Sequence, residues 1–289
     1  MATFVGIHGI GQQYRGKYSL SEAWHSALRD GLAAAGYEDE AEKVSAADVR
    51  VMFFGGAFRP DGAMADDDPP YSPEDIKPGP ETDLLRTLYE AAMEQDATLG
   101  PGAGAMSAGG ASVKAMLLQL LRTPIFSGIV QRAFIGNLKQ VTRFLADESF
   151  KEQVFSCVDT GVDENTRVVI GHSLGSIVAY EYMCRFQPAS VRLLLTLGSP
   201  LGIPRLVFDR LTPQPVNGKG AWAGTVPTWV NVAAPNDTVA LCQQLAGLFP
   251  GPQSQTVDDR SVDNGRDAHS IERYLNARQT GSALHEAFT

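Results

Sequence analysis

The sequence predicts an α/β fold in which a mostly parallel sheet is covered by helices on both faces. Short apolar runs alternate with longer segments whose apolar residues recur at helical spacing. Two of the runs end in glycine-containing turns, at residues 6–11 and 171–175, as strands that lead into helices often do. Hydrophobic residues make up 44% of the 289 residues, which is ordinary for a globular core. Such an alternation favours parallel strands joined by helical crossovers.

The expected elements follow one another in a simple order, and we treat residues 1–289 as one domain. Strands are expected at residues 4–7, 49–54, 167–170, 191–197 and 228–232. Helices are expected at residues 21–35, 83–96, 137–157 and 174–186, with a last helix that begins near Ser270. Met116 to Leu121, within the most apolar part of the chain, is also expected to be helical.

Composition excludes several classes of function. The chain has 24 Lys+Arg and 33 Asp+Glu, a net charge of −9, and an acidic surface repels nucleic-acid phosphates. The three cysteines are odd in number and widely spaced, which indicates neither a disulfide framework nor a zinc site. The first residues do not form a signal peptide, and no apolar stretch has spanning length, so we expect a cytoplasmic protein without a membrane span.

The strongest functional signal is the run Gly-His-Ser-Leu-Gly at residues 171–175, which matches the G-x-S-x-G pattern. A serine nucleophile needs its hydroxyl on a very tight turn between a strand and a helix. Glycines two residues to either side, Gly171 and Gly175, let the backbone turn there without side-chain clashes. An apolar strand before the turn and an amphipathic helix after it favour Ser173 as a nucleophile.

A serine nucleophile also needs a histidine base and a carboxylate that orients the base. In this type of site the acid and then the histidine follow the serine in the chain, which leaves His269 and His285. His285 lies four residues from the end of the sequence, where chains fray. His269 lies at a loop end beside an expected helix, so we predict His269 as the base.

Asp237 is the predicted acid because it follows the strand at residues 228–232, at the sheet edge where sites assemble. Asp209, which follows an apolar run, is the best alternative. Four other acidic residues lie in a polar stretch with no expected strand directly before them: Asp258, Asp259, Asp263 and Asp267. The glycine-rich turn after the first strand could supply backbone amides as an oxyanion hole, with Ile10 and Leu174 as the predicted donors.

One rival motif is a phosphate-loop pattern, G-x-x-x-x-G-K, at residues 11–17. The next position must be Ser or Thr to ligate magnesium, and here it is Tyr18. A calcium-loop resemblance at residues 259–270 also fails, because Asn264 replaces the required glycine and Ser270 the required glutamate. The sequence therefore predicts no metal and no cofactor.

These motifs resemble the α/β-hydrolase superfamily, in particular its lipase and esterase branch. The resemblance is carried by residues 8–11, 171–175, 197–200, 236–237 and 268–270, and extends over the sheet-forming two-thirds of the chain. It implies a triad of Ser173, Asp237 and His269, with Ile10 and Leu174 as oxyanion donors. It also implies that His172, which precedes the nucleophile, is not the base.

Two departures from the family pattern concern the sheet and the lid. The sequence begins directly on the strand before His8, so we expect a small sheet. A long insertion, at about residues 58–136, precedes the nucleophile, whereas the family's mobile lid usually follows it. We expect this insertion to form a helical cap with glycine-rich hinges. Its expected apolar face would line an acyl site and consists of Met116, Leu117, Leu120, Leu121, Ile125, Phe126, Ile129 and Val130.

The sequence as a whole predicts a metal-free serine hydrolase that cleaves a carboxylic ester through an acyl-enzyme. The expected substrate is a small-molecule acyl ester or a lipid-like molecule. The sequence is also compatible with transient contact between the protein and lipid. The same residues could serve a thioesterase, an amidase or an acyltransferase. A non-catalytic binding protein that keeps the fold is a further alternative. The sequence does not define the acyl chain length or the oligomeric state.

Overall fold

A computed structural model describes residues 3–12, 15–58, 71–95, 112–123, 131–237 and 239–288. The chain forms two compact units, which we describe separately. The sheet unit consists of Met1–Ala57 and Lys151–Thr289, and the insertion unit consists of Phe58–Phe150. Among the described residues, no helix combines the length and the apolar character needed to cross a membrane.

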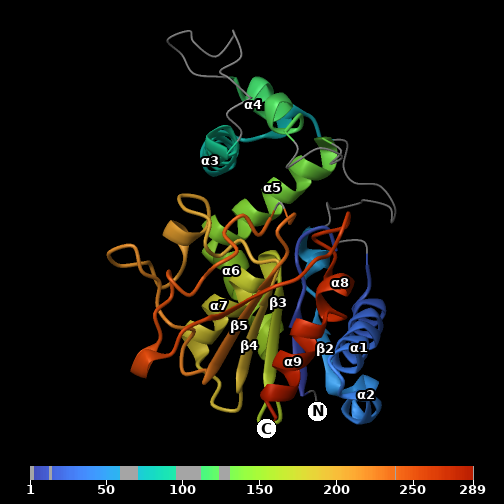
Figure 1. The fold of residues 1–289 in the computed structure, drawn as a ribbon. Helices are drawn as coiled ribbons and strands as arrows, with labels where there is room; N and C mark the ends of the chain where they lie inside the picture. The colour runs from blue at the N-terminus through green and yellow to red at the C-terminus, as the bar shows by residue number, and fades with distance from the viewer. Residues whose placement is uncertain are drawn as a thin grey trace. The chain divides into compact units, whose positions relative to one another are not determined.

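The described part of the sheet unit contains one sheet of six parallel strands (Figure 1). The strands are β1 (Phe4–Ile7), β2 (Val49–Met52), β3 (Val168–His172), β4 (Leu193–Leu197), β5 (Thr228–Ala233) and β6 (Asp258–Ser261). Their order is β2-β1-β3-β4-β5-β6. The order reverses between β1 and β3, and such a switch point is where open parallel sheets form sites beyond the carboxyl ends of their strands.

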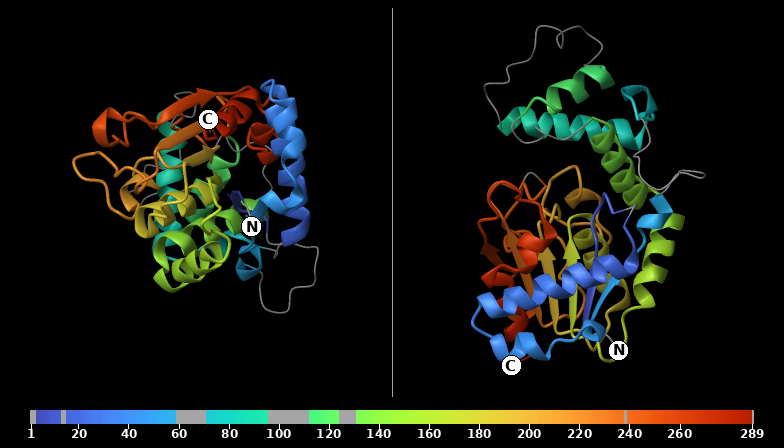
Figure 2. Two further views of the ribbon diagram at one scale, coloured as in Figure 1. Left: turned by 90° about the horizontal axis from the view of Figure 1, so that it is seen from below. Right: turned by 90° about the vertical axis from the view of Figure 1, so that its right-hand side faces the viewer.

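Helices cover both faces of this sheet, as Figures 1 and 2 show. Its helices are α1 (Lys17–Ala34), α2 (Glu38–Lys43), α6 (Glu148–Asp159, which begins in the insertion unit), α7 (Leu174–Phe186), α8 (Ile271–Leu275) and α9 (Arg278–Glu286). One core joins α1, α8 and α9 to apolar side chains from β1 to β5. On the other face α7 packs against β1, β3 and β4. Burial on both faces explains the nearly continuous apolar sequences of β1, β3 and β4.

Helices α1 and α9 cross in direct backbone contact. A Cβ atom added at Gly281 would collide with the carbonyl group of Gly31, and one added at Gly31 would collide with the carbonyl of Leu275. Only glycine lets the two backbones approach so closely. This crossing ties the last helix of the chain to the first.

The described part of the insertion unit is helical, with α3 (Pro80–Gln95), α4 (Val113–Leu120) and α5 (Gln131–Ala146). Helix α3 packs against α4 and α5. The Ser112 hydroxyl caps α4 by accepting a hydrogen bond from the Ala115 amide at 3.3 Å. Three residues of the expected apolar face are buried, namely Met116, Leu117 and Leu120. Ile125, Phe126, Ile129, Val130 and most of the expected hinges lie outside the described residues.

The structure differs from the expected elements at several places, and helix α2 was not expected. The helix expected at residues 137–157 is two helices, α5 and α6, because the Asp147 carboxylate caps α6 by accepting from the Phe150 amide at 3.0 Å. The last helix is likewise divided into α8 and α9. Strand β6 was not expected, so Asp258 and Asp259 lie within a strand and not in a polar loop. Short 3-10 turns complete the described elements: η1 (Ala46–Asp48), η2 (Gly55–Phe58), η3 (Pro73–Asp75), η4 (Phe208–Arg210) and η5 (Pro252–Ser254).

Candidate active site

Ser173 lies in the sharp turn between β3 and α7, at the carboxyl end of a central strand. Its backbone has φ 55° and ψ −128°, and a positive φ is uncommon for a residue with a side chain. A Cβ atom at Gly171 would lie 2.6 Å from the Gly175 carbonyl oxygen, and one at Gly175 would collide with the end of β1. The two flanking glycines are therefore required by close packing around the turn.

A chain of buried hydroxyl groups holds this turn against the loop after β4. The Ser176 hydroxyl lies 2.6 Å from the Ser173 carbonyl oxygen and 2.7 Å from Ser199 Oγ. Because a carbonyl can only accept, Ser176 donates to Ser173, and Ser199 in turn donates to Ser176. Ser199 Oγ also accepts from the Leu201 amide at 3.2 Å. This chain restrains the strained backbone on which Ser173 sits.

His269 and Asp237 form a hydrogen-bonded pair in which His269 is half-buried and Asp237 is buried. Nδ1 of His269 lies 2.8 Å from Oδ2 of Asp237, whose side chain is completely buried. A carboxylate can only accept, so Nδ1 carries the proton and Nε2 presents a lone pair. Nε2 is buried and has no hydrogen-bond partner among the described residues. An unsatisfied buried nitrogen is costly, and a group that takes up a proton during a reaction is one explanation for it.

Asp237 is held as a carboxylate by its hydrogen bonds. Burial by itself raises the pKa of this carboxyl group, whereas the bonds from His269 and Tyr274 lower it, and the net effect is a lowered pKa. Oδ1 accepts from the Val239 amide at 2.8 Å and from the Ala240 amide at 3.3 Å. Asp237 therefore presents a negative charge to His269 from a fixed position.

Two residues that the sequence did not indicate as supporting groups contact this pair. The Tyr274 hydroxyl donates to Oδ2 of Asp237 at 2.7 Å. Nε2–H of His172 donates to the carbonyl oxygen of His269 at 3.0 Å, and the two imidazole rings lie 4.7 Å apart. Burial and the nearby His269 lower the pKa of His172 to about 3, so this ring is neutral near pH 7. In the sequence Tyr274 is one apolar position of a helix, and nothing there signals its contact.

The loop after β1 lies directly against the nucleophile turn. A Cβ atom added at Gly9 would lie 2.6 Å from Cβ of Ser173. His8 is buried, its Nδ1–H donates to the Gly9 carbonyl at 2.7 Å, and its Nε2 accepts from the Phe54 amide at 3.2 Å. The amide of Leu174 begins α7, where the first amides of a helix have no partner within the helix.

Three of the competing acids and bases, Asp209, His285 and Asp259, are engaged elsewhere. Asp209 accepts a hydrogen bond from the backbone amide of Arg205 at 2.5 Å, in a local turn. His285 is part of α9 and contacts the Glu40 carboxylate at 2.8 Å, with its ring stacked on Tyr37. Asp259 accepts from the amides of Leu245 and Ala246. Burial raises the thiol pKa of all three cysteines, Cys157, Cys184 and Cys242, which disfavours a thiolate nucleophile.

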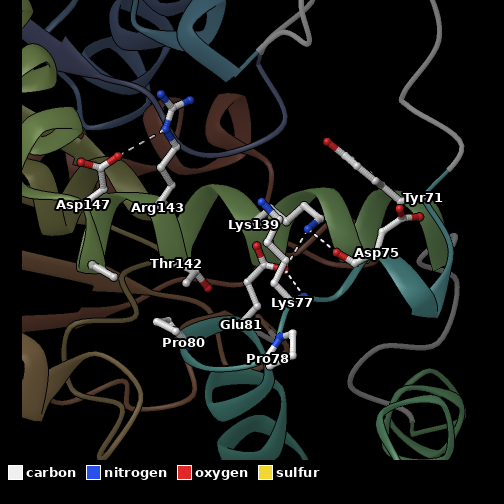
Figure 3. Close-up of a pocket in the computed structure, with 11 residues that line it drawn as sticks. Tyr71, Asp75, Lys77, Pro78, Pro80, Glu81, Lys139, Thr142, Arg143 and Asp147 are labelled. Carbon is white, nitrogen blue, oxygen red and sulfur yellow. Dashed lines mark hydrogen bonds and ion pairs between the residues drawn. The ribbon is translucent and has the colours of Figure 1, made fainter.

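The insertion unit contains a separate pocket of about 600 Å³, shown in Figure 3. Its charged side chains largely satisfy one another. Lys139 Nζ lies 2.8 Å from a Glu81 carboxylate oxygen and also donates to the Asp75 carbonyl. Arg143 lies 3.9 Å from Asp147. The pocket therefore shows no pair comparable to His269 and Asp237.

Comparison with known proteins supports the same fold class. Residues 136–217 match a protein-family model described as a PGAP1-like alpha/beta domain, which belongs to the α/β-hydrolase superfamily. Neither a curated protein nor a solved structure matches the chain significantly. The matched stretch contains Ser173 and its turn but ends before Asp237 and His269. With the six parallel strands and their flanking helices, the match identifies an α/β-hydrolase fold and indicates a hydrolase.

Proposed function

We propose that the protein is a serine hydrolase that cleaves a carboxylic ester, with Ser173 as nucleophile, His269 as base and Asp237 as the orienting acid. The observation that carries the proposal is the pair of His269 and Asp237, in which Nδ1 is bonded at 2.8 Å and Nε2 is left buried without a partner among the described residues. The strained turn that presents Ser173 lies at the same edge of the sheet.

The proposed reaction proceeds through an acyl-enzyme. The Ser173 hydroxyl oxygen attacks the ester carbonyl while Nε2 of His269 takes the hydroxyl proton. Negative charge then develops on the carbonyl oxygen, and the amides of Ile10 and Leu174 are the proposed donors to it. The alcohol leaves with the proton from His269, and a water molecule activated by the same nitrogen releases the acid. Asp237 stabilises the imidazolium formed in both steps.

An ester is favoured over the other acyl bonds for a chemical reason. An alkoxide departs with less help from an acid than an amine does, and the sequence resembles lipases and esterases. A thioester, an amide or transfer to an alcohol would use the same residues and remains the second candidate. A binding protein without activity would need neither the strained turn at Ser173 nor an unpartnered nitrogen on His269.

Covalent labelling with a fluorophosphonate tests the nucleophile. We expect labelling of the native chain at Ser173, located by peptide mass spectrometry, and none in Ser173→Ala. The same substitution should lower kcat on an ester by on the order of 10⁴-fold, because the residues of a triad act as a unit. Ser45→Ala, at an exposed serine, is the control and should behave like the native chain. Substantial turnover by Ser173→Ala would rule out the proposed nucleophile.

The acid is tested by a matched pair of substitutions. Asp237→Asn replaces the acceptor at His269 by an amide that can stabilise the wrong tautomer, so kcat should fall by on the order of 10³-fold or more. Asp209→Asn, at the alternative acid, should leave kcat nearly unchanged. A large loss in Asp209→Asn with normal kcat in Asp237→Asn would assign the acid to Asp209.

A further inference from the structure

The hydroxyl group of Tyr274 lies between the backbone of β5 and the carboxylate of Asp237. It accepts a hydrogen bond from the Ala234 amide at 2.9 Å and donates one to Oδ2 of Asp237 at 2.7 Å. Ala234 follows β5 directly, and Tyr274 belongs to α8. The hydroxyl thus links the end of a strand to a side chain three residues farther along the same loop.

Oδ2 of Asp237 is shared by two donors, Tyr274 and His269. Tyr274 is completely buried, so water cannot replace its hydroxyl without rearrangement. Burial and the neighbouring Asp237 raise the pKa of the phenol, so it remains a protonated donor throughout the working range. The direction of the Asp237 carboxylate is therefore set from both sides, by backbone amides at Oδ1 and by the phenol at Oδ2.

We propose that Tyr274 is a positioning residue, which orients the Asp237 carboxylate and through it the imidazole of His269 for proton transfer from Ser173. The inference rests on the proposed serine hydrolase function and assigns Tyr274 a part in it. The Tyr274 hydroxyl forms no covalent bond and transfers no proton in the reaction. It limits where Oδ2 can lie, and its hydrogen bond reduces the negative charge on Oδ2 that faces His269.

Tyr274→Phe removes one oxygen atom and keeps the aromatic ring in the core. Asp237 then loses a donor, which raises the pKa of its carboxyl group and lets it move. The ionisable side chains near Asp237 are His269, Tyr274 and the neutral His172. Loss of the donor also leaves more negative charge facing His269, which favours a proton on that ring. The acid limb of the kcat/KM profile therefore shifts to higher pH, since the reaction requires a neutral His269.

The matched control is Tyr182→Phe. The Tyr182 hydroxyl is also part of a buried aromatic side chain and donates to a carboxylate, Asp159 Oδ1, at 2.9 Å. Tyr182 and Asp159 belong to α7 and α6, and no hydrogen bond or ring contact described for Tyr182 involves the proposed triad. The two substitutions thus delete the same kind of bond, one at the site and one away from it.

The experiment measures kcat, KM and the pH dependence of kcat/KM for a p-nitrophenyl ester, with active sites counted by fluorophosphonate labelling. We expect Tyr274→Phe to lower kcat on the order of 10-fold, with KM within about twofold, and to move the acid limb upward by about half a pH unit or more. Tyr182→Phe should leave kcat and the acid limb unchanged. Native kcat and an unmoved acid limb in Tyr274→Phe, or equal effects of the two substitutions, would overturn the proposal.

A second variant covers the case in which Tyr274→Phe does not fold. Tyr274→3-fluorotyrosine keeps the hydroxyl and makes it a stronger donor, so the acid limb should move to lower pH. No shift, or a shift to higher pH, would overturn the proposal. Failure of the proposed function has a different signature, because the native chain would then not be labelled at Ser173 and Ser173→Ala would retain its activity.

Discussion

Two buried histidines, His8 and His172, make the stability of the sheet unit depend on pH. Burial lowers the pKa of His8 to about 4, and burial together with the nearby His269 lowers that of His172 to about 3, from an ordinary value of 6.5. Below about pH 6.5 these two histidines bind protons in the unfolded chain, whereas in the folded chain they stay neutral. Stability is therefore greatest above pH 6.5 and falls as the pH decreases toward 4.

Urea unfolding at pH 7 and at pH 5 measures this effect. We expect a loss of about 2 kcal/mol for each of the two histidines over that interval. His8→Gln should remove about half of the pH dependence, and His25→Gln, at a histidine bonded to the Val44 carbonyl, should preserve it. An unfolding free energy that is the same at both pH values would contradict the assignment of these rings as neutral.

At the residue scale, the sequence indicated the parts of the candidate site that have a local pattern. Ser173 was predicted because its two glycines are required by the turn, and Asp237 because it follows a strand. The bond between Asp237 and His269 joins residues 32 positions apart, so each was predicted separately, from chain order and from its place beside an expected strand or helix. Tyr274 and His172 were not assigned supporting roles, because their contacts arise only when α8, the end of β3 and the loop after β5 meet. The catalytic roles themselves stay predictions.

At the scale of elements, substitution of a glycine by alanine at the crossing of α1 and α9 has two opposing effects on stability, both of known size. By helix propensity alone, Gly281→Ala would stabilise α9 by about 1 kcal/mol. The added Cβ would instead collide with the backbone of Gly31. Forcing the two helices apart costs about 1–3 kcal/mol or more, so the net change should be destabilising.

Thermal unfolding of two glycine variants checks this prediction. Gly281→Ala should lower the melting temperature by several degrees. Gly136→Ala, in α5, is the control, because its Cβ would meet only the Tyr71 ring at 3.7 Å, an ordinary contact. It should leave the melting temperature unchanged or raise it. A rise in Gly281→Ala would show that the helices can separate without cost.

The elements that the sequence predicted well are those with a clear apolar period. Helix α7 was expected at its observed bounds, and five of the six described strands were expected within a few residues. Strand β6 was missed because its sequence, Asp-Asp-Arg-Ser, is polar throughout. This strand pairs on one side only, with β5, and its Asp259 carboxylate is satisfied by two backbone amides and by the Asn231 amide. Such compensation depends on tertiary contacts, which no local pattern reveals.

At the scale of the whole molecule, we propose that the insertion unit sets the preference for acyl chain length. Intact protein should give higher kcat/KM for p-nitrophenyl laurate than for the acetate. Deletion of residues 105–132, which removes α4 with its buried Met116, Leu117 and Leu120, should abolish that preference. Labelling at Ser173 should persist, because it reports on the sheet unit. Acetate as the best substrate, or an unchanged preference after the deletion, would show that the insertion unit has another role.

The sheet unit is assembled from two separate stretches of the chain, and this has a consequence for biosynthesis. Strand β1 pairs with β3, and Phe4 lies opposite Val168. Strand β1 therefore gains its second neighbouring strand only after Val168 has left the ribosome. At 5–20 residues per second, translation of the intervening insertion takes on the order of ten seconds. During that interval β1 and β2 can pair only with each other and pack only against the helix between them, without β3 and α7, so most of the sheet unit's core is missing. The nascent protein therefore leaves the β3-pairing edge of β1 open to chaperones and to aggregation until synthesis has passed the nucleophile turn.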